Sequence, residues 1–334
     1  MTTEPPPRVA LGIDVGGTEI KAGLVNDHGQ VLHLVRYATP AGASADGVIA
    51  EMGRAAHEAR AGLADDLQVE GVGITTPAFS LGPEWVQLLS SNIPAFEGIP
   101  LRQALTEVFG PSLVWEYDTH AALLAEMRFG PAGAYERVLY VGLGTGVSCG
   151  VAVSGELVGH WHGTCGNVGH VIVDPVRGRP CTCGGRGCLE SVLGGWALRD
   201  AALEIAASGE SRQLAEVYDE RGDLGAADLA VAAEAGDPAA SEVWKRAGQA
   251  LGVALASWVH IYLPDAVFVG GGVSGAGELL LGPARETMSA LASPTCLERV
   301  QTVERGVMGR DAGVIGVASS VFHRASDAGT EALP

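Results

Sequence analysis

Three cysteines close together, Cys181, Cys183 and Cys188, are the residues of this chain whose spacing points most directly to chemistry. With His170 they supply three thiolates and one imidazole, the closed tetrahedral set that is typical of a structural Zn²⁺ site. Such a set leaves no position for a reactive water molecule. The sequence therefore predicts a zinc ion with a structural role, and buried or disulfide-linked thiols are the alternative.

Composition argues against the disulfide alternative. Residues 1–8 are polar and rich in proline, without the basic start and apolar stretch of a secretory signal, so we expect a cytoplasmic protein with a disordered start. Disulfides are rare in that reducing compartment. No run approaches the roughly 20 apolar residues of a membrane helix, and a net charge of −18 disfavours binding to nucleic acid. We expect neither a membrane nor a nucleic-acid partner.

Glycine-rich turns follow three apolar segments, at residues 16–18, 142–146 and 270–272. Backbone N–H groups in such turns can approach phosphate oxygens closely, and Asp14 adds a carboxylate at the end of the first segment. Residues 19–26 alternate like a strand, whereas dinucleotide and P-loop motifs require a helix there. Each turn alone could be a plain hairpin, but together they indicate a nucleotide site.

Alternating strand and helix patterns predict an α/β fold. The first part reads as strands at 9–14, 19–26 and 30–37, a helix at 45–63 and a strand at 71–75, and the second part repeats this scheme from residue 137. We expect two lobes that face one cleft. The smaller comprises residues 9–117 with a C-terminal helix at about 312–326, and the larger comprises residues 118–311 with the zinc-binding insert.

Three motifs carry a family resemblance. They are Asp14-x-Gly16-Gly17-Thr18-x-x-Lys21-x-Gly23, then Gly142-x-Gly144-Thr145-Gly146, then Cys181-x-Cys183-Gly184-x-x-Gly187-Cys188-Leu189-Glu190. Together they resemble the ROK family of bacterial sugar kinases and repressors. The resemblance implies a two-lobed, actin-like and ribonuclease-H-like ATPase fold with ATP and Mg²⁺ in the cleft. Repressors of the family carry a DNA-binding domain before the first motif; only about a dozen residues precede it here, so we expect a kinase.

The resemblance also implies roles for individual residues. Asp118, where a strand meets a helix, would be the catalytic base, although an ordinary helix N-cap is the alternative. Asn92, His170 and Glu190 would lie near the sugar hydroxyls, although Asn92 could be a simple turn residue. The nucleotide would contact the following set: Asp14, Gly16, Gly17, Thr18, Lys21, Gly144, Thr145, Gly146, Gly271 and Gly272.

Three positions depart from the glucose kinases of the family. Tyr117 stands where those enzymes have a sugar-binding Asn, His120 stands where Asn is usual, and Asn167 replaces a sugar-binding Glu. A site built for particular hydroxyls discriminates strongly between analogues. We therefore expect Tyr117 and Asn167 to contact a sugar altered near C2 or C3, such as an aminohexose of the kanosamine kind.

The expected function is thus phosphoryl transfer from ATP to the 6-hydroxyl of a hexose or aminohexose. A cyclitol that resembles a sugar is a second class of acceptor, and a non-catalytic sugar sensor is an alternative function. An actin-like assembly protein is disfavoured by the cysteine motif. By resemblance, the chain would form a homodimer or homotetramer, and polyphosphate could replace ATP as donor.

Overall fold

The structure is a computed structural model that describes residues 7–64, 67–77, 79–88, 90, 92–158 and 167–327. Among these residues the chain forms two compact units. The first comprises residues 7–134, 157–158 and 307–327, and the second comprises residues 135–156 and 167–306. Each unit contains one five-stranded mixed sheet with helices, which confirms the α/β class. Most of the start expected to be disordered, residues 1–6, lies outside the described residues.

The sheet of the first unit has the order β3-β2-β1-β4-β7. Its strands are β1 (Val9–Val15), β2 (Glu19–Asn26), β3 (Val31–Ala38), β4 (Val69–Thr76) and β7 (Leu113–Tyr117). The first three strands form antiparallel hairpins, whereas β4 and β7 run parallel to β1. Because parallel strands end at the same edge of a sheet, the last residues of β1, β4 and β7 lie side by side.

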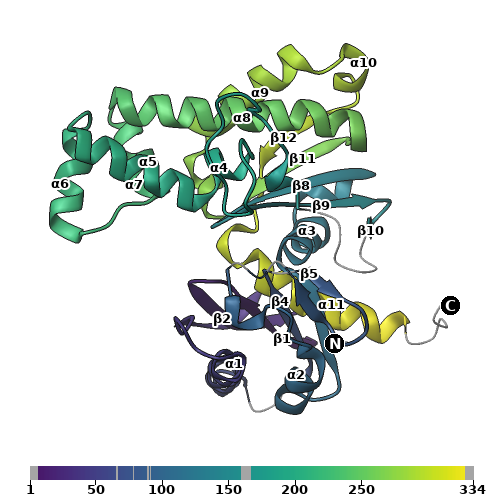
Figure 1. Cartoon of the computed structure of the whole chain (residues 1–334). Helices are drawn as coiled ribbons and strands as arrows, with labels where there is room; N and C mark the ends of the chain where they lie inside the picture. Colours follow the sequence, from purple (N-terminus) through teal and green to yellow (C-terminus); the bar gives the residue numbers. More distant parts are fainter. Residues whose placement is uncertain are drawn as a thin grey trace. The chain divides into compact units, whose positions relative to one another are not determined.

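The two faces of this sheet pack against different helices, because side chains alternate along a strand. Val9, Leu11 and Ile13 of β1 share a core with α1 (Ala45–Ala61) and α2 (Leu101–Phe109). On the other face, small residues allow α11 (Ala312–Asp327) to pack closely against the sheet. A Cβ atom at Gly12 would lie only 2.2 Å from the carbonyl oxygen of Val314. Figure 1 shows α11 beside β1 and β4.

The helix α3 (Asp118–Phe129) belongs to the first unit, on the other side of the boundary expected from the sequence. It packs against α11, and a Cβ atom at Gly316 would lie 1.7 Å from the carbonyl oxygen of Ala121. The backbones of the two helices are therefore in direct contact. The short η2 helix (Pro131–Ala134) then ends this part of the unit.

The sheet of the second unit has the order β10-β9-β8-β11-β12. Its strands are β8 (Arg137–Leu143), β9 (Val147–Val153), β10 (Glu156–Leu157), β11 (Ala266–Gly270) and β12 (Thr302–Arg305). Its helices are α4 (Glu190–Leu193), α5 (Gly195–Ser208), α6 (Arg212–Arg221), α7 (Ala226–Glu234), α8 (Pro238–Tyr262), α9 (Glu278–Leu291) and α10 (Pro294–Leu297). The long helix α8 lies against α9 (Figure 1), with Gly252 close to the backbone of α9.

Several elements were not expected from the sequence. After β4, the chain contains the short hairpin β5 (Phe79–Leu81) and β6 (Val86–Leu88) and the 3₁₀ turn η1 (Pro94–Phe96). Three-residue strands are too short to show an alternating pattern. The helix α9 contains Pro283, and a proline usually ends a helix, so the local sequence pattern does not predict α9. Among the described residues, no helix is long and apolar enough to cross a membrane.

Candidate active site and metal centre

Polar residues gather where β1, β4 and β7 end in the first unit. The strand register places Asp14 beside Thr75, and Thr75 beside Glu116. Tyr117 ends β7 beside Thr76, and Asp118 follows as the first residue of α3. Carboxyl ends of parallel strands are the usual place for ligands in open α/β sheets.

The carboxylate of Asp14 is held by two side chains. One oxygen accepts a hydrogen bond from the Thr75 hydroxyl at 2.7 Å, and the other lies 3.0 Å from the Lys21 ammonium group. Lys21 also donates to the carbonyl oxygen of Arg310 at 2.8 Å, just before α11. A Cβ atom at Gly313 would lie 2.9 Å from the Asp14 carboxyl carbon. Asp14 therefore lies against the first turn of α11, where the helix dipole favours negative charge.

Asp118 is the second carboxylate at this edge. Its Oδ1 accepts hydrogen bonds from the backbone N–H of Thr119 at 2.6 Å and from the Thr119 hydroxyl at 3.0 Å. Burial, followed by the negative charge of Asp14, raises the pKa of Asp118 from 3.8 to about 6, against the effect of these bonds. The N-cap residue of α3 is Tyr117, so capping does not account for the carboxylate of Asp118.

The first glycine turn lies between β1 and β2 and is accessible at Gly17 and Thr18. The Thr39 hydroxyl donates to the carbonyl oxygen of Gly16 at 2.6 Å and thereby ties the turn to the segment that follows β3. A Cβ atom at Gly17 would lie 2.6 Å from the backbone oxygen of Asn92. The structure thus brings Asn92 into direct contact with the first glycine turn.

Tyr117, His120 and Glu116 form a buried cluster behind Asp118. The Tyr117 and His120 rings meet edge to face, with centroids 5.4 Å apart, and His120 Nδ1 lies 3.4 Å from the Glu116 carboxylate. All three side chains are buried, and His120 Nε2 has no hydrogen-bond partner in the part of the chain that the structure describes. Tyr117 and His120, two of the positions that the sequence led us to expect to differ from glucose kinases, are therefore in contact with each other.

The other two glycine turns are neighbours in the second unit. Gly144 and Thr145 are exposed between β8 and β9, and the turn is closed by a hydrogen bond from Gly144 N to the Gly146 oxygen at 3.0 Å. Gly271 follows β11 with a φ of 84°, and a Cβ atom there would lie 2.2 Å from the Leu143 oxygen. Gly271 and the exposed Gly272 thus lie next to the end of β8, immediately before the turn that contains Gly144.

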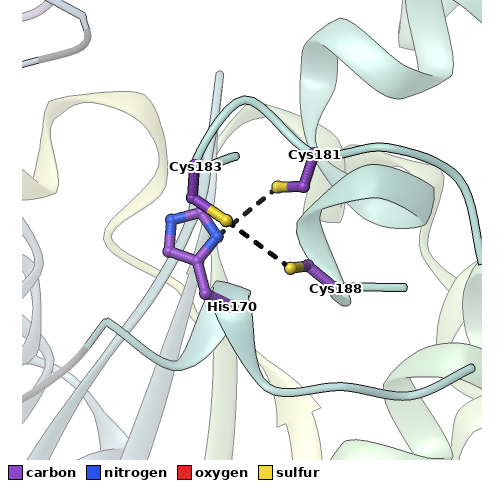
Figure 2. Close-up of side chains that lie close together, drawn as sticks. All are labelled: His170, Cys181, Cys183 and Cys188. Carbon is purple, nitrogen blue, oxygen red and sulfur yellow. Dashed lines mark hydrogen bonds between the residues drawn. The ribbon is translucent and has the colours of Figure 1, made fainter. Parts of the chain in front are cut away.

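The four predicted metal ligands converge in the second unit (Figure 2). The nitrogen and sulfur atoms of His170, Cys181, Cys183 and Cys188 all lie within 4.8 Å of one another. His170 Nδ1 lies 3.5 Å from Cys181 Sγ, and the Sγ atoms of Cys183 and Cys188 are 3.7 Å apart. Burial, more than the neighbouring thiols, raises the pKa of Cys188 to about 12, so a metal-free thiolate is unfavourable there.

These separations fit a tetrahedral zinc ion. Bonds of about 2.3 Å to sulfur and about 2.0–2.1 Å to nitrogen imply edges of about 3.8 Å between sulfurs and about 3.6 Å between sulfur and nitrogen. Both measured separations lie close to these edges. Three thiolates and one imidazole form a complete ligand set, as expected for a structural site.

Glu190 begins α4, two residues after Cys188, and is buried. Its Oε2 accepts a hydrogen bond from the backbone N–H of Val147 at 3.0 Å. Its Oε1 accepts from the Thr182 hydroxyl at 3.2 Å and from the Trp196 indole at 3.4 Å. Glu190 is therefore anchored within the protein, and its expected contact with a sugar hydroxyl stays a prediction.

Asn167 lies at the N-cap of the 3₁₀ turn η3 (Val168–His170), and its side chain is exposed. Sequence reasoning missed Thr75, Gly313 and Thr182, which hold or adjoin the candidate residues. Thr75 could have been noticed as a polar residue at the end of a buried strand. Nothing local in the sequence marks Gly313, because its partner Asp14 is distant along the chain.

We predict that replacing Cys183 by Ser removes the metal. The chain should bind about one zinc ion, and loss of one thiolate should lower the zinc content well below one per chain and lower the Tm by roughly 5 °C or more. Metal analysis and calorimetry measure both effects. Cys296→Ser is the control, since Cys296 lies outside the cluster. Wild-type protein that binds no zinc would contradict the assignment.

Comparison with known proteins gives consistent results. The sequence profile described as "ROK family" matches residues 10–324. A glucokinase of Thermotoga maritima is 32% identical over 314 residues, covering 94% of this chain and 97% of that enzyme. A kanosamine kinase of Amycolatopsis mediterranei is 31% identical over 265 residues, covering 78% of this chain and 80% of that enzyme.

A solved structure agrees with the fold. The ROK family glucokinase of Streptomyces griseus, in complex with glucose and AMPPNP, superposes with a TM-score of 0.81 at 29% identity, covering 94% of this chain and 99% of that one. The expected two-lobed, actin-like fold class is thereby confirmed. Since the family profile spans nearly the whole chain and the three motifs lie within it, this protein belongs to the ROK family.

Proposed function

We propose that this chain is an ATP-dependent kinase that transfers the γ-phosphoryl group to the 6-hydroxyl of a hexose or aminohexose. The observation that carries the proposal is Asp118, a carboxylate of raised pKa beside Asp14 at the carboxyl edge of the first sheet. Membership of a family with glucokinases among its members supports the reaction class.

Asp118 has the properties of a general base for a hydroxyl group. Deprotonated Asp118 accepts the proton of the attacking hydroxyl as its oxygen bonds to the γ-phosphorus, and the bond from that phosphorus to the bridging oxygen breaks so that ADP leaves. Because a base works best when its pKa is near the working pH, a pKa of about 6 suits it better than the ordinary value. The hydrogen bonds from Thr119 occupy Oδ1 and orient the carboxyl group.

In each unit, the exposed glycine turns have the properties of a phosphate-binding segment, and Asp14 adds a carboxylate beside the turn of the first unit. Gly17 and Thr18 in the first unit and Thr145 in the second are exposed residues whose backbone N–H groups can donate to phosphate oxygens. A magnesium ion bound with the nucleotide would neutralise charge on the phosphates, and the oxygen ligands of Asp14 are the type that Mg²⁺ prefers.

Replacement of Asp118 by Asn should lower kcat by about 10²- to 10⁴-fold, because the amide cannot accept the hydroxyl proton. The rate is measured by coupling ADP formation to NADH oxidation. Asp46→Asn is the matched control, since Asp46 also lies in the first turn of a helix, α1, and should change kcat less than twofold. An Asp118→Asn enzyme with the wild-type kcat would show that Asp118 is not the catalytic base.

The acid limb of the pH profile provides a second prediction. The base must be ionised, so kcat/KM should be constant above pH 7 and fall as pH decreases through about 6, to about a tenth of its plateau at pH 5. The residual activity of Asp118→Asn should lack this limb. A wild-type limb centred near pH 4, or a limb that persists in the variant, contradicts the assignment.

The identity of the acceptor depends on Tyr117 and Asn167. We propose that the site prefers a hexose modified near C2 or C3, because Tyr117 replaces an amide and packs against His120, and Asn167 replaces a carboxylate. The similarity to a kanosamine kinase supports this preference, and the similar identity to glucokinases supports a glucose-like acceptor. A cyclitol with a comparable ring is the remaining class.

A panel of acceptors decides among these classes. We predict that kcat/KM for 2-amino- or 3-aminoglucose exceeds that for glucose, mannose and N-acetylmannosamine, with a C7 cyclitol as the further comparison. Replacing Tyr117 by Asn should shift the ratio of kcat/KM values toward glucose by about tenfold or more. Clear preference of the wild type for glucose would refute the modified acceptor while leaving the kinase intact.

A non-catalytic sensor is the second candidate function. The observations that favour it are the same departures at Tyr117, His120 and Asn167, which alter the expected sugar contacts. A sensor has no chemical need for an acidic base, yet Asp118 and Lys21 are both present. If the wild type consumes no ATP with any member of the panel but binds one of them, the sensor interpretation is preferred.

A further inference from the structure

The metal cluster and the second glycine turn are parts of one packed assembly in the second unit. Cys181 and Cys183 flank Thr182, whose hydroxyl donates to Glu190 at 3.2 Å. The other oxygen of Glu190 accepts from the N–H of Val147 at 3.0 Å, the first residue after the turn. The Glu190 carboxylate therefore connects the loop that carries Cys181 and Cys183 to the end of the Gly144–Gly146 turn.

Packing reinforces this connection from the histidine side. Gly169 immediately precedes the ligand His170, and a Cβ atom there would lie 2.3 Å from the Val147 oxygen. A Cβ atom at Gly146 would lie 2.7 Å from the Glu190 carboxylate. The segments that carry His170 and Glu190 thus enclose Val147 at close range, so the turn cannot shift without moving one of them.

The helix junction that follows Glu190 supports the other end of the turn. Gly195 N donates to the Gly144 oxygen at 2.9 Å, and a Cβ atom at Gly194 would lie 3.1 Å from the Thr145 oxygen. These contacts fix the carbonyl groups of the turn on the inner side and leave Gly144 and Thr145 exposed. The Gly144 N–H already donates to the Gly146 oxygen, so the N–H of Thr145 is the one that the proposed function assigns to a phosphate oxygen.

We infer that Glu190 and Thr182 are positioning residues that tie the metal cluster to the nucleotide-binding turn, so that zinc occupancy controls nucleotide affinity as well as stability. The inference rests on the proposed function in assigning nucleotide phosphates to this turn. A carboxylate that is buried with its donors in place holds them firmly, because leaving its charge unpaired is costly. Without the metal, the loop that carries Thr182 loses its constraint and the turn loses one of its supports.

The test uses zinc-loaded Thr182→Val, which removes the hydroxyl and keeps the shape of the side chain. We expect unchanged zinc content, faster hydrogen exchange at the N–H of Val147 by at least about fivefold, and a Kd for a non-hydrolysable ATP analogue with Mg²⁺ that rises about tenfold. Thr182→Ser restores the donor and should restore both values. Metal-stripped wild type should show the same changes, and Thr302→Val, elsewhere in the second unit, should show neither.

The outcomes separate the inference from the proposed kinase. The inference would be overturned if Thr182→Val keeps its zinc and shows the wild-type hydrogen-exchange rate at Val147 and the wild-type nucleotide Kd. It would also be overturned if the variant loses its zinc, because the Thr182 hydroxyl would then stabilise the loop that binds the metal. If Thr182→Val does not fold, Trp196→Phe removes another donor to Glu190 without changing the loop, and the same two readouts decide. If the kinase proposal is wrong, the wild type would transfer no phosphoryl group, while Thr182→Val would still change the hydrogen-exchange rate at Val147.

Discussion

The carboxylate of Asp14 joins three elements of the first unit, β2, β4 and α11. It binds Thr75 of β4 and Lys21 of β2, and it lies against Gly313 in the first turn of α11. Any side chain at Gly313 would enter the space of the carboxylate, so the place where α11 begins is set by this contact. The negative charge of Asp14 also contributes to the raised pKa of Asp118. One partly buried charge therefore contributes both to the packing of the unit and to the raised pKa of its candidate catalytic group.

The second unit follows the same principle with a different carboxylate. Glu190 joins the metal loop, the indole of Trp196 and the start of β9. In both units, an acid close to a glycine turn accepts hydrogen bonds from neighbouring segments and leaves the turn exposed. Polar groups that must be satisfied when buried thereby fix the backbone around each turn, while Gly17, Thr18, Gly144 and Thr145 stay exposed.

Local sequence patterns predicted much of this arrangement. Alternation and glycine spacing indicated β1, β2, β8 and the turns, and the ligand set of the metal cluster followed from donor chemistry alone. Long-range contacts could not be predicted, because nothing in the local pattern pairs Asp14 with Gly313 or Thr182 with Glu190. The unit boundary after α3 depends on direct backbone contact with α11, which requires Gly316. The sequence did not predict α9, because this helix contains Pro283 and a proline usually marks the end of a helix.

We propose that a γ-phosphoryl group passes from ATP to a sugar hydroxyl made reactive by Asp118. Phosphorus NMR of the chain with ATP, Mg²⁺ and glucose or an aminoglucose tests it most directly, because the spectrum distinguishes a sugar phosphate from inorganic phosphate. We expect a phosphomonoester at the 6-position that accumulates in step with ADP. Inorganic phosphate as the sole product, or ATP that stays intact with every sugar tested, would contradict it.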